Sequence, residues 1–242
     1  VASDRARLND SIREERRARE RLERYHSPAV VEAIVGHHHA AEKDRHETRE
    51  VSVMFADIVG FTTRCQTMDP PDVARFLGEF FTLASDAVFE FGGTLDKFIG
   101  DAVMVFFGAP IPQEDHAERA VRAAVALHRR MAAWNRERVA EGLDEVKVRT
   151  AINSGVVVVG DIGSESRVDY TILGNTVNVT ARLEELVAKP NQIVIGPATF
   201  AAVGGLFPTE HLGDVALRGL QGKTPVYRIA VEKIPEPPAP ES

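Results

Sequence analysis

Two apolar, β-prone stretches that each end at one aspartate constrain this chain more than any other feature. The first, EVSVMFADIVGFTT, spans Glu50–Thr63 and carries Asp57; the second, FGGTLDKFIGDAVMVFFGAP, spans Phe91–Pro110 and carries Asp101. A carboxylate beside a buried strand is costly unless its charge is compensated. Mg²⁺ could compensate it, because this ion favours one or two protein carboxylates together with substrate phosphate oxygens. Two ions about 3.5–4 Å apart can clamp the attacking and leaving oxygens of a phosphoryl reaction, so metal-dependent nucleotide chemistry is our first hypothesis.

Each aspartate also has a simpler explanation when it is taken alone. Asp101 follows Gly100, and Gly-Asp pairs are common in turns, while Asp57 could cap the loop after the first strand. The metal hypothesis therefore depends on what the rest of the chain adds.

The order of the predicted elements indicates an α+β fold with a ferredoxin-like core. The expected strands are Val51–Ile58, a strand from Thr94, Ala102–Phe107 after a tight turn at Gly100–Asp101, and Val146–Ile152. The expected helices run from Asp69 to about Phe91 and over about His116–Glu137. This β-α-β-β-α-β order is the ferredoxin-like split unit. The remainder adds a hairpin at about Val156–Ile172, a helix at about Thr176–Ala188, and short strands near Ile193 and at Val226–Ile229.

Residues 1–46 are predicted to form a charged helical lead-in and a linker. Residues 4–25 favour a helix with many i,i+4 charge pairs. The apolar positions of a candidate coiled-coil seam are Leu8, Ile12, Leu22 and Tyr25. Charged residues interrupt that seam at Glu15 and Arg19, so a coiled coil and a solvated single helix are equally open.

A short helix is expected at Ala29–Val35, and a histidine-rich segment follows it. The histidines are His37, His38, His39 and His46. They could bind a metal, but consecutive histidines rarely present a defined coordination geometry, so a polar linker is expected. The main domain is then predicted over residues 47–232, and the Pro-rich tail over residues 233–242 is predicted to be disordered.

Charge and cysteine content narrow the functional classes. The net charge of −7 does not suggest a general nucleic-acid-binding surface. The single cysteine, Cys65, excludes an internal disulfide framework and favours a reducing, cytoplasmic location. No apolar run approaches the roughly 20 residues that a membrane span needs, and the charged N-terminus does not resemble a signal peptide. Because the chain starts at Val1 and enters directly into a helical pattern, we expect it to be part of a longer protein.

The segment VDYTILGNTVNVTARLEEL adds polar residues to a predicted helix. Asn178 and Arg182 are four residues apart and so share one helix face. Either Asn175 or Thr176 is expected to cap this helix. Apolar neighbours make much of the helix buried, so an Asn/Arg stripe on it favours a polar ligand. The planar fork of an arginine suits phosphate oxygens and can stabilise charge that develops in a transition state.

Three motifs together resemble the catalytic domain of the class III nucleotidyl cyclases. They are FADIVGFT, DKFIGDAVMVFFG and YTILGNTVNVTARL, in this order and spacing. The likeness covers about Val51 to Ala230, and RERLERYHSPAVVEAIV resembles the helical lead-in that follows a sensor domain in bacterial members. The resemblance implies a signalling lyase, an adenylyl cyclase that makes 3′,5′-cyclic AMP and pyrophosphate from ATP by in-line attack of the ribose 3′-oxygen on the α-phosphorus.

The resemblance also implies roles for individual residues. Asp57 and Asp101 would hold two Mg²⁺ or Mn²⁺ ions, with the backbone carbonyl of Ile58 as a further ligand. Asn178 and Arg182 would orient the ribose and stabilise the transition state.

The purine and the triphosphate would be bound by four other residues. Lys97 matches the adenine-selecting lysine, where guanylyl cyclases carry Glu. Thr171 stands where many adenylyl cyclases have Asp, and it resembles a bacterial and soluble subgroup associated with bicarbonate stimulation. A hydroxyl can still accept a hydrogen bond from the adenine amino group. Arg149 and Lys223 match the triphosphate-binding positions.

In this family the metal and purine residues of one site come from different halves. A head-to-tail homodimer would therefore build two sites across its two-fold interface. One chain would supply Asp57, Asp101 and Arg149, and its partner Lys97, Thr171, Asn178, Arg182 and Lys223. Two N-terminal helices could then pair and pass a rotation from an upstream sensor domain to the interface.

Two alternatives stay open. A guanylyl or diguanylate cyclase could use the same fold, since FGGTLDKFIGD lies where diguanylate cyclases place a Gly-Gly-acidic motif. Lys97 argues against guanine, and a helix with Asn178 and Arg182 fits neither a diguanylate cyclase nor a polymerase. A catalytically silent nucleotide-sensing or dimerisation module would have lost a metal or transition-state residue, and no matched position is lost.

Overall fold

The computed structural model describes residues 46–164, 167–217 and 222–235. The core elements are β1 (His46–Ile58), α3 (Phe61–Cys65), α4 (Pro70–Glu90), β2 (Thr94–Ile99), β3 (Ala102–Phe107), α5 (His116–Ala140) and β4 (Val148–Ser164). They are followed by β5 (Arg167–Leu173), α6 (Asn175–Leu186), β6 (Ile193–Ile195), α7 (Pro197–Val203), β7 (Thr209–Ala216), β8 (Lys223–Ile229) and the 3-10 helix η1 (Val231–Lys233). The helices and histidines predicted within residues 4–39 and most of the Pro-rich tail lie outside the described residues.

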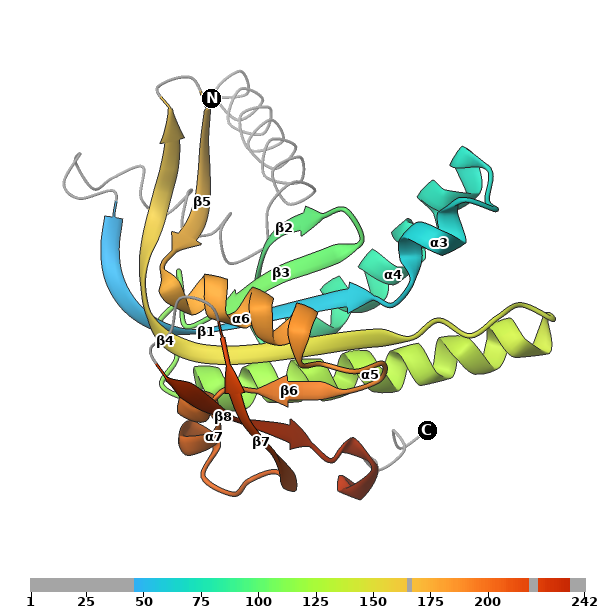
Figure 1. Ribbon diagram of the computed structural model, residues 1–242. Helices are drawn as coiled ribbons and strands as arrows, with labels where there is room; N and C mark the ends of the chain where they lie inside the picture. Colours follow the sequence, from blue (N-terminus) through green and yellow to red (C-terminus); the bar gives the residue numbers. More distant parts are fainter. Residues whose placement is uncertain (1–45, 165–166, 218–221, 236–242) are drawn as a thin grey trace, which may run out of the picture.

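The described strands form one mixed sheet in the order β2-β3-β1-β4-β6-β8-β7, with β5 paired to the outer part of β4 (Figure 1). β1 lies between β3 and β4 and runs antiparallel to both. The first four strands therefore stand in the order β2-β3-β1-β4, which is the arrangement of a ferredoxin-like unit. The predicted α+β fold with this core is confirmed.

The long strand β4 corrects one sequence prediction. Val146–Ile152 and the first half of the hairpin from Val156 were expected to be separate elements, but β4 is one strand of 17 residues. Between them lie Asn153, Ser154 and Gly155, which interrupt the apolar pattern of the sequence. Asn153 and Ser154 are buried, and Ser154 Oγ lies 2.6 Å from the Ser52 hydroxyl on β1, so the strand continues through them.

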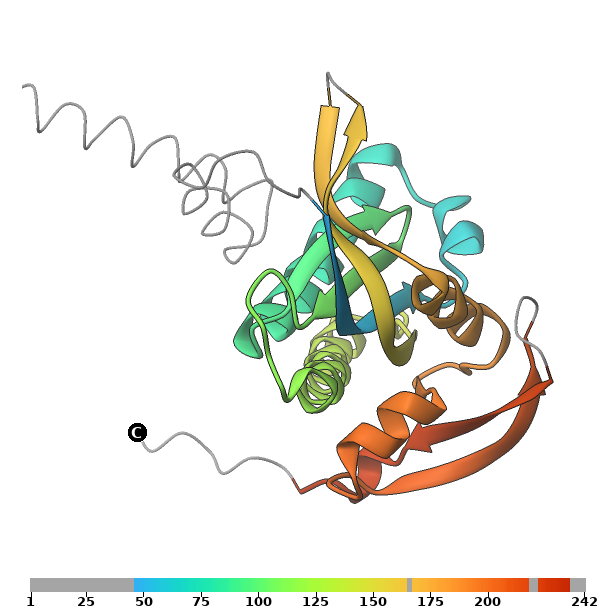
Figure 2. The ribbon, with the colours of Figure 1, turned by 90° about the vertical axis from the view of Figure 1, so that its left-hand side faces the viewer.

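Strand β1 is also longer than expected, because β4 pairs with all of it. The register runs from His46 opposite Gly160 to Ile58 opposite Val148. His46 is therefore part of the sheet rather than of a linker. Beyond this ladder, β4 and β5 continue as a two-stranded arm that projects from the body of the domain (Figure 2).

The two faces of the sheet are covered differently. Alternate residues of a strand point to opposite faces, so Met54 and Ala56 pack with α4 and α5, whereas Phe55 lies in a second cluster with Val177 of α6. Helices α4 and α5 cover one face, and the shorter α6 covers part of the other (Figure 1). Asp57 follows Phe55 by two positions and therefore faces α6.

Helix α6 begins differently from the prediction. Its N-cap is Gly174 and no side chain caps it, so neither Asn175 nor Thr176 has the expected role. Instead Thr176 Oγ1 donates to the Val156 carbonyl at 3.0 Å and ties α6 to β4. Close packing against Gly155 fits this tie, because a Cβ there would lie 2.8 Å from Thr176 Oγ1.

Four short elements were not predicted, namely α3, α7, β7 and η1. The helices predicted from Asp69 and from His116 are present as α4 and α5. Among the described helices, none combines the length and apolarity that a bilayer crossing requires.

Candidate active site

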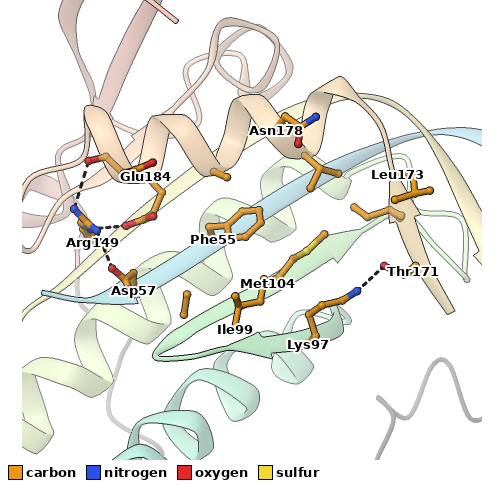
Figure 3. A pocket seen from close by; sticks show the side chains of 15 residues that line it. Phe55, Asp57, Lys97, Ile99, Met104, Arg149, Thr171, Leu173, Asn178 and Glu184 are labelled. Atoms are coloured by element: carbon orange, nitrogen blue, oxygen red, sulfur yellow. Dashed lines mark hydrogen bonds and ion pairs between the residues drawn. The ribbon is translucent and has the colours of Figure 1, made fainter. Parts of the chain in front are cut away.

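A groove of about 610 Å³ lies between α6 and the exposed face of the sheet (Figure 3). It is lined by Phe55, Asp57, Lys97, Ile99, Ala102, Met104, Arg149, Thr171, Ile172, Leu173, Val177, Asn178, Ala181, Glu184 and Glu185. Polar groups lie at its two ends. One end holds Asp57 with Arg149, the other Lys97 with Thr171, and apolar side chains such as Phe55 and Met104 lie between them (Figure 3).

The register of β1 and β4 builds the acidic end. Asp57 and Arg149 are direct cross-strand partners, and Arg149 Nη2 donates to Asp57 Oδ2 at 2.8 Å. Arg149 Nε also forms an ion pair with Glu184 of α6. Burial raises the pKa of Glu184 to about 7, although the charge of Arg149 opposes this. Arg149 therefore links the sheet to α6 and compensates two carboxylates.

Asp101 lies next to this end, in the two-residue turn between β2 and β3. Burial, the negative charge of Asp57 and a side-chain hydrogen bond with Asp57 raise the pKa of Asp101 to about 6. Two neighbouring carboxyl groups, one of which disfavours the ionisation of the other, form a site that attracts positive charge.

Asp57 and Asp101 suit a hard divalent cation such as Mg²⁺. Within the described ranges there is no cluster of three or more His, Cys, Asp or Glu side chains that could hold a metal. Asp57 and Asp101 offer hard oxygen donors, and Mg²⁺ commonly takes only one or two protein carboxylates and completes its shell with waters and substrate phosphates. Ile58 points its side chain into the core and could contribute only its backbone carbonyl.

The opposite end of the groove joins β2 to β5. Lys97 Nζ donates to Thr171 Oγ1 at 3.3 Å, although the two residues are 74 positions apart in the sequence. The Thr171 hydroxyl in turn donates to Asp96 Oδ2 at 2.7 Å. Lys97 Nζ lies 3.4 Å from Asp96 Oδ1, and the Asp96 side chain is only 1% exposed. The two residues that were expected to read the purine are thus in contact.

Of the remaining expected site residues, Asn178 lines the groove, whereas Arg182 and Lys223 do not. Asn178 lines the groove from α6, as Figure 3 shows. Arg182 is one turn further along α6, partly buried and outside the groove lining. Lys223 is exposed at the first position of β8, also outside the lining. One chain therefore gathers Asp57, Arg149, Lys97, Thr171 and Asn178 around its groove, but not Arg182 or Lys223.

Sequence reasoning missed Asp96 and Glu184. Asp96 directly precedes Lys97, and Glu184 follows Arg182 by two positions, so both were hidden inside charge-rich motifs. The sequence offered one signal, the adjacent residues Asp96 and Lys97 on a predicted strand. Successive strand residues normally face opposite sides, so one of these two charged side chains would have to face the covered side of the sheet.

Comparison with known proteins supports the resemblance noted in the sequence. A sequence model of the family described as Adenylate and Guanylate cyclase catalytic domain matches residues 43–231. "Adenylate cyclase 1" of Rhizobium meliloti (strain 1021) is 35% identical over 182 residues, which are 75% of this chain. The match spans only 27% of that relative's length.

Solved structures of both substrate classes resemble the domain equally well. The adenylyl cyclase CyaB from P. aeruginosa has a TM-score of 0.73 and 30% identity, covering 76% of this chain and 95% of its own. The guanylyl cyclase Cya2 also has a TM-score of 0.73, with 32% identity and coverage of 77% and 94%. The fold therefore does not distinguish the two substrates. The chain belongs to the family of adenylate and guanylate cyclase catalytic domains, the class III nucleotidyl cyclases.

Proposed function

We propose that this domain is an adenylyl cyclase that converts ATP to 3′,5′-cyclic AMP and pyrophosphate. The observation that carries the proposal is the pairing of Lys97 with Thr171 at one end of a groove whose other end holds Asp57 and Arg149. An ammonium donor beside a hydroxyl oxygen suits a purine edge with a ring-nitrogen acceptor next to an amino donor.

Asp57, Asp101 and the Ile58 carbonyl are the residues that would hold two Mg²⁺ or Mn²⁺ ions. When bound, such ions lower the pKa of the attacking 3′-hydroxyl and stabilise charge around the α-phosphate. Arg149 is poised beside the same carboxylates, 2.8 Å from Asp57, and its guanidinium can turn from Asp57 toward phosphate oxygens.

Two residues of α6 complete the proposed site. Asn178 is exposed on the groove side of the helix, where its amide can orient the ribose. Arg182 supports the charge that develops on the reacting phosphate. No covalent enzyme intermediate is required, so positioning and electrostatic stabilisation supply the rate.

We further propose that the active form is a head-to-tail homodimer with ATP bound between the chains. Within one chain, apolar Phe55 and Met104 separate the carboxylate end of the groove from the purine end. A two-fold pairing would place the Asp57 end of one protomer opposite the Lys97 end of its partner. Arg182 and Lys223, which do not line the groove of their own chain, would then reach the partner's nucleotide.

The alternative substrate is GTP, because a guanylyl cyclase matches this fold as closely as an adenylyl cyclase does. The deciding experiment incubates the purified protein with ATP or GTP and with Mg²⁺ or Mn²⁺, and identifies the products. Cyclic AMP formed from ATP, with activity per chain rising with protein concentration, supports both the reaction and the dimer. Cyclic GMP would reverse the substrate assignment. Nucleotide binding without a cyclic product would identify a silent nucleotide-sensing module instead.

A further inference from the structure

The Asp96 carboxylate is a buried acidic group to which the proposed reaction assigns no role. Its side chain is 1% exposed, yet it lies at the purine end of the groove beside Lys97 and Thr171. Burial raises its pKa, and the Thr171 hydrogen bond and the Lys97 charge oppose that rise. Burying a carboxylate costs stability unless it is paired and hydrogen-bonded. The contacts of Asp96 with Lys97 and Thr171 therefore point to a role for Asp96 at these two residues.

A strand irregularity explains how two consecutive residues reach the same partner. In the β2–β3 ladder Leu95 pairs with Val105 and Lys97 with Met104, so Asp96 is an extra residue in β2. A regular strand would send Asp96 and Lys97 to opposite faces. A β-bulge adds one residue and re-aims the side chains around it. Here both side chains turn toward Thr171 on β5, with contacts of 2.7 Å and 3.3 Å.

The hydrogen-bond donors and acceptors of Asp96, Lys97 and Thr171 permit one arrangement of protons. An ammonium group can only donate hydrogen bonds, and an ionised carboxylate can only accept them. A hydroxyl has one proton to donate and two lone pairs. The Thr171 proton is therefore directed to Asp96 Oδ2, one Thr171 lone pair accepts from Lys97, and the other lone pair is left for a ligand.

We infer that Asp96 is a positioning residue that holds the Thr171 hydroxyl as a hydrogen-bond acceptor and thereby selects a base with an amino group over one with a carbonyl oxygen. The inference deepens the proposed function and rests on it, because it assumes that Thr171 meets the purine. Adenine carries an amino donor at the position where guanine carries a carbonyl acceptor. Without Asp96, Thr171 could turn its proton toward a ligand and would accept either base.

The test compares Asp96→Asn with the unmodified protein, and Asp169→Asn is the matched control. Asp169 lies on β5 two positions before Thr171, is exposed and also places its charge near Asp96. The readout is the ratio of kcat/KM for ATP to that for GTP. Partial misfolding lowers both rates by the same factor and leaves the ratio unchanged.

The amide of Asp96→Asn can donate to the Thr171 oxygen and release the hydroxyl proton. We expect the ATP:GTP ratio to fall by roughly tenfold, the upper end of what one neutral hydrogen bond is worth. Asp169→Asn is expected to leave the ratio unchanged. An unchanged ratio in Asp96→Asn, or an equal fall in both variants, would overturn the inference. If the unmodified protein forms no cyclic product, the proposed function fails, and the ratio of ATP to GTP dissociation constants is measured in the same variants.

A second variant tests the contact without any nucleotide and decides the matter if Asp96→Asn does not fold. Thr171→Val keeps the shape of the side chain but removes the proton that Asp96 accepts. The charged groups facing Asp96, Lys97 and Asp169, are kept. An ionised Asp96 then loses its hydroxyl donor, whereas a protonated Asp96 no longer needs one, so the stability cost of this variant should be largest at neutral pH and should shrink as the pH is lowered through the titration of Asp96. A cost that stays the same down to the acid-unfolding range would show that Asp96 does not hold the Thr171 proton.

Discussion

Asp57 and Arg149 lie directly opposite each other on β1 and β4, and the guanidinium donates to the carboxylate across 2.8 Å. The same guanidinium forms an ion pair with Glu184 on α6. The side chains of Asp57 and Glu184 are 14% and 10% exposed. One arginine thus compensates two nearly buried carboxylates that come from opposite sides of the groove.

Removing this arginine should destabilise the fold. Arg149→Ala leaves Glu184 buried without its partner, and breaking a buried ion pair by deleting one member costs about 3 kcal/mol. Arg149→Lys restores the charge but not the planar fork, so its unfolding free energy should lie between those of the alanine variant and the unmodified protein. Urea denaturation monitored by circular dichroism measures both. If Arg149→Ala unfolds at the same urea concentration as the unmodified protein, the arginine does not compensate Glu184.

The two proposed metal ligands should be required for turnover but not for folding. Asp57→Ala and Asp101→Ala are expected to lower cyclic nucleotide formation at least on the order of a hundredfold, since each removes a group that organises charge at the reacting phosphate. Asp101→Asn should fold as well as the unmodified protein at neutral pH, because it relieves the repulsion from Asp57 that raises the Asp101 pKa to about 6. Asp161→Ala, an exposed aspartate on β4, is the control. Substantial activity in the Asp57 or Asp101 variants would rule out the two-metal assignment.

Loss of the Lys97 ammonium group should lower kcat/KM for ATP more than kcat/KM for GTP. Lys97→Met keeps much of the aliphatic stem but removes the ammonium group that donates to Thr171. The expected loss in kcat/KM for ATP is roughly tenfold, the value of one charge-assisted hydrogen bond. Lys147→Met removes an exposed lysine just before β4 and should change neither substrate. Steady-state kinetics with both nucleotides separates these outcomes, and equal losses for ATP and GTP would argue against a purine-reading role.

Acid should destabilise the domain through His128. This residue of α5 is buried, its Nε2 lies 3.0 Å from Thr150 Oγ1 on β4, and burial lowers its pKa to about 4. Above about pH 6.5 the imidazole is neutral in both states, so its contribution is complete. As the pH falls from 6.5 toward 4, the unfolded chain takes up a proton that the folded chain refuses, which removes up to about 3 kcal/mol of stability.

The variant His128→Gln tests this pH dependence. Glutamine cannot gain a charge, so the stability difference between the unmodified protein and the variant should shrink between about pH 7.5 and about pH 4.5. Thermal unfolding across this range gives the comparison. Two parallel pH profiles would mean that His128 does not contribute to acid sensitivity.

Gly93, in the loop between α4 and β2, and Gly78, inside α4, should respond oppositely to replacement by alanine. A Cβ on Gly93 would lie 2.6 Å from two ring carbons of Phe107 and 2.7 Å from Val88 Cγ1. Gly93→Ala should therefore cost about 1–3 kcal/mol through overpacking. Gly78, inside α4, has open space around the added methyl, and Gly78→Ala should stabilise by up to about 1 kcal/mol. Chemical denaturation of both variants checks the signs, and a stable Gly93→Ala would show that Phe107 can move aside.

Much of the fold could be read from local patterns. The apolar runs of β1 and β3 and the three- and four-residue periodicity of α4 and α5 indicated the ferredoxin-like core, with boundaries close to the observed ones for β3, α4 and α5. The patterns misjudged β4, because Asn153 and Ser154 look like a break until β1 and α7 supply their surroundings: the Ser154 hydroxyl lies 2.6 Å from that of Ser52 and 2.8 Å from that of Thr199.

The sequence by itself determined the order of the main elements, the family, and the positions of Asp57 near the end of a strand and of Asp101 in a turn, because these features depend on neighbours along the chain. Only the tertiary structure decided that Arg149 faces Asp57 and that Asp96 is buried against Thr171. Both facts follow from strand register and from a β-bulge. Register is set by pairing between residues far apart in the chain, and burial by what packs over them, so no local pattern contains either.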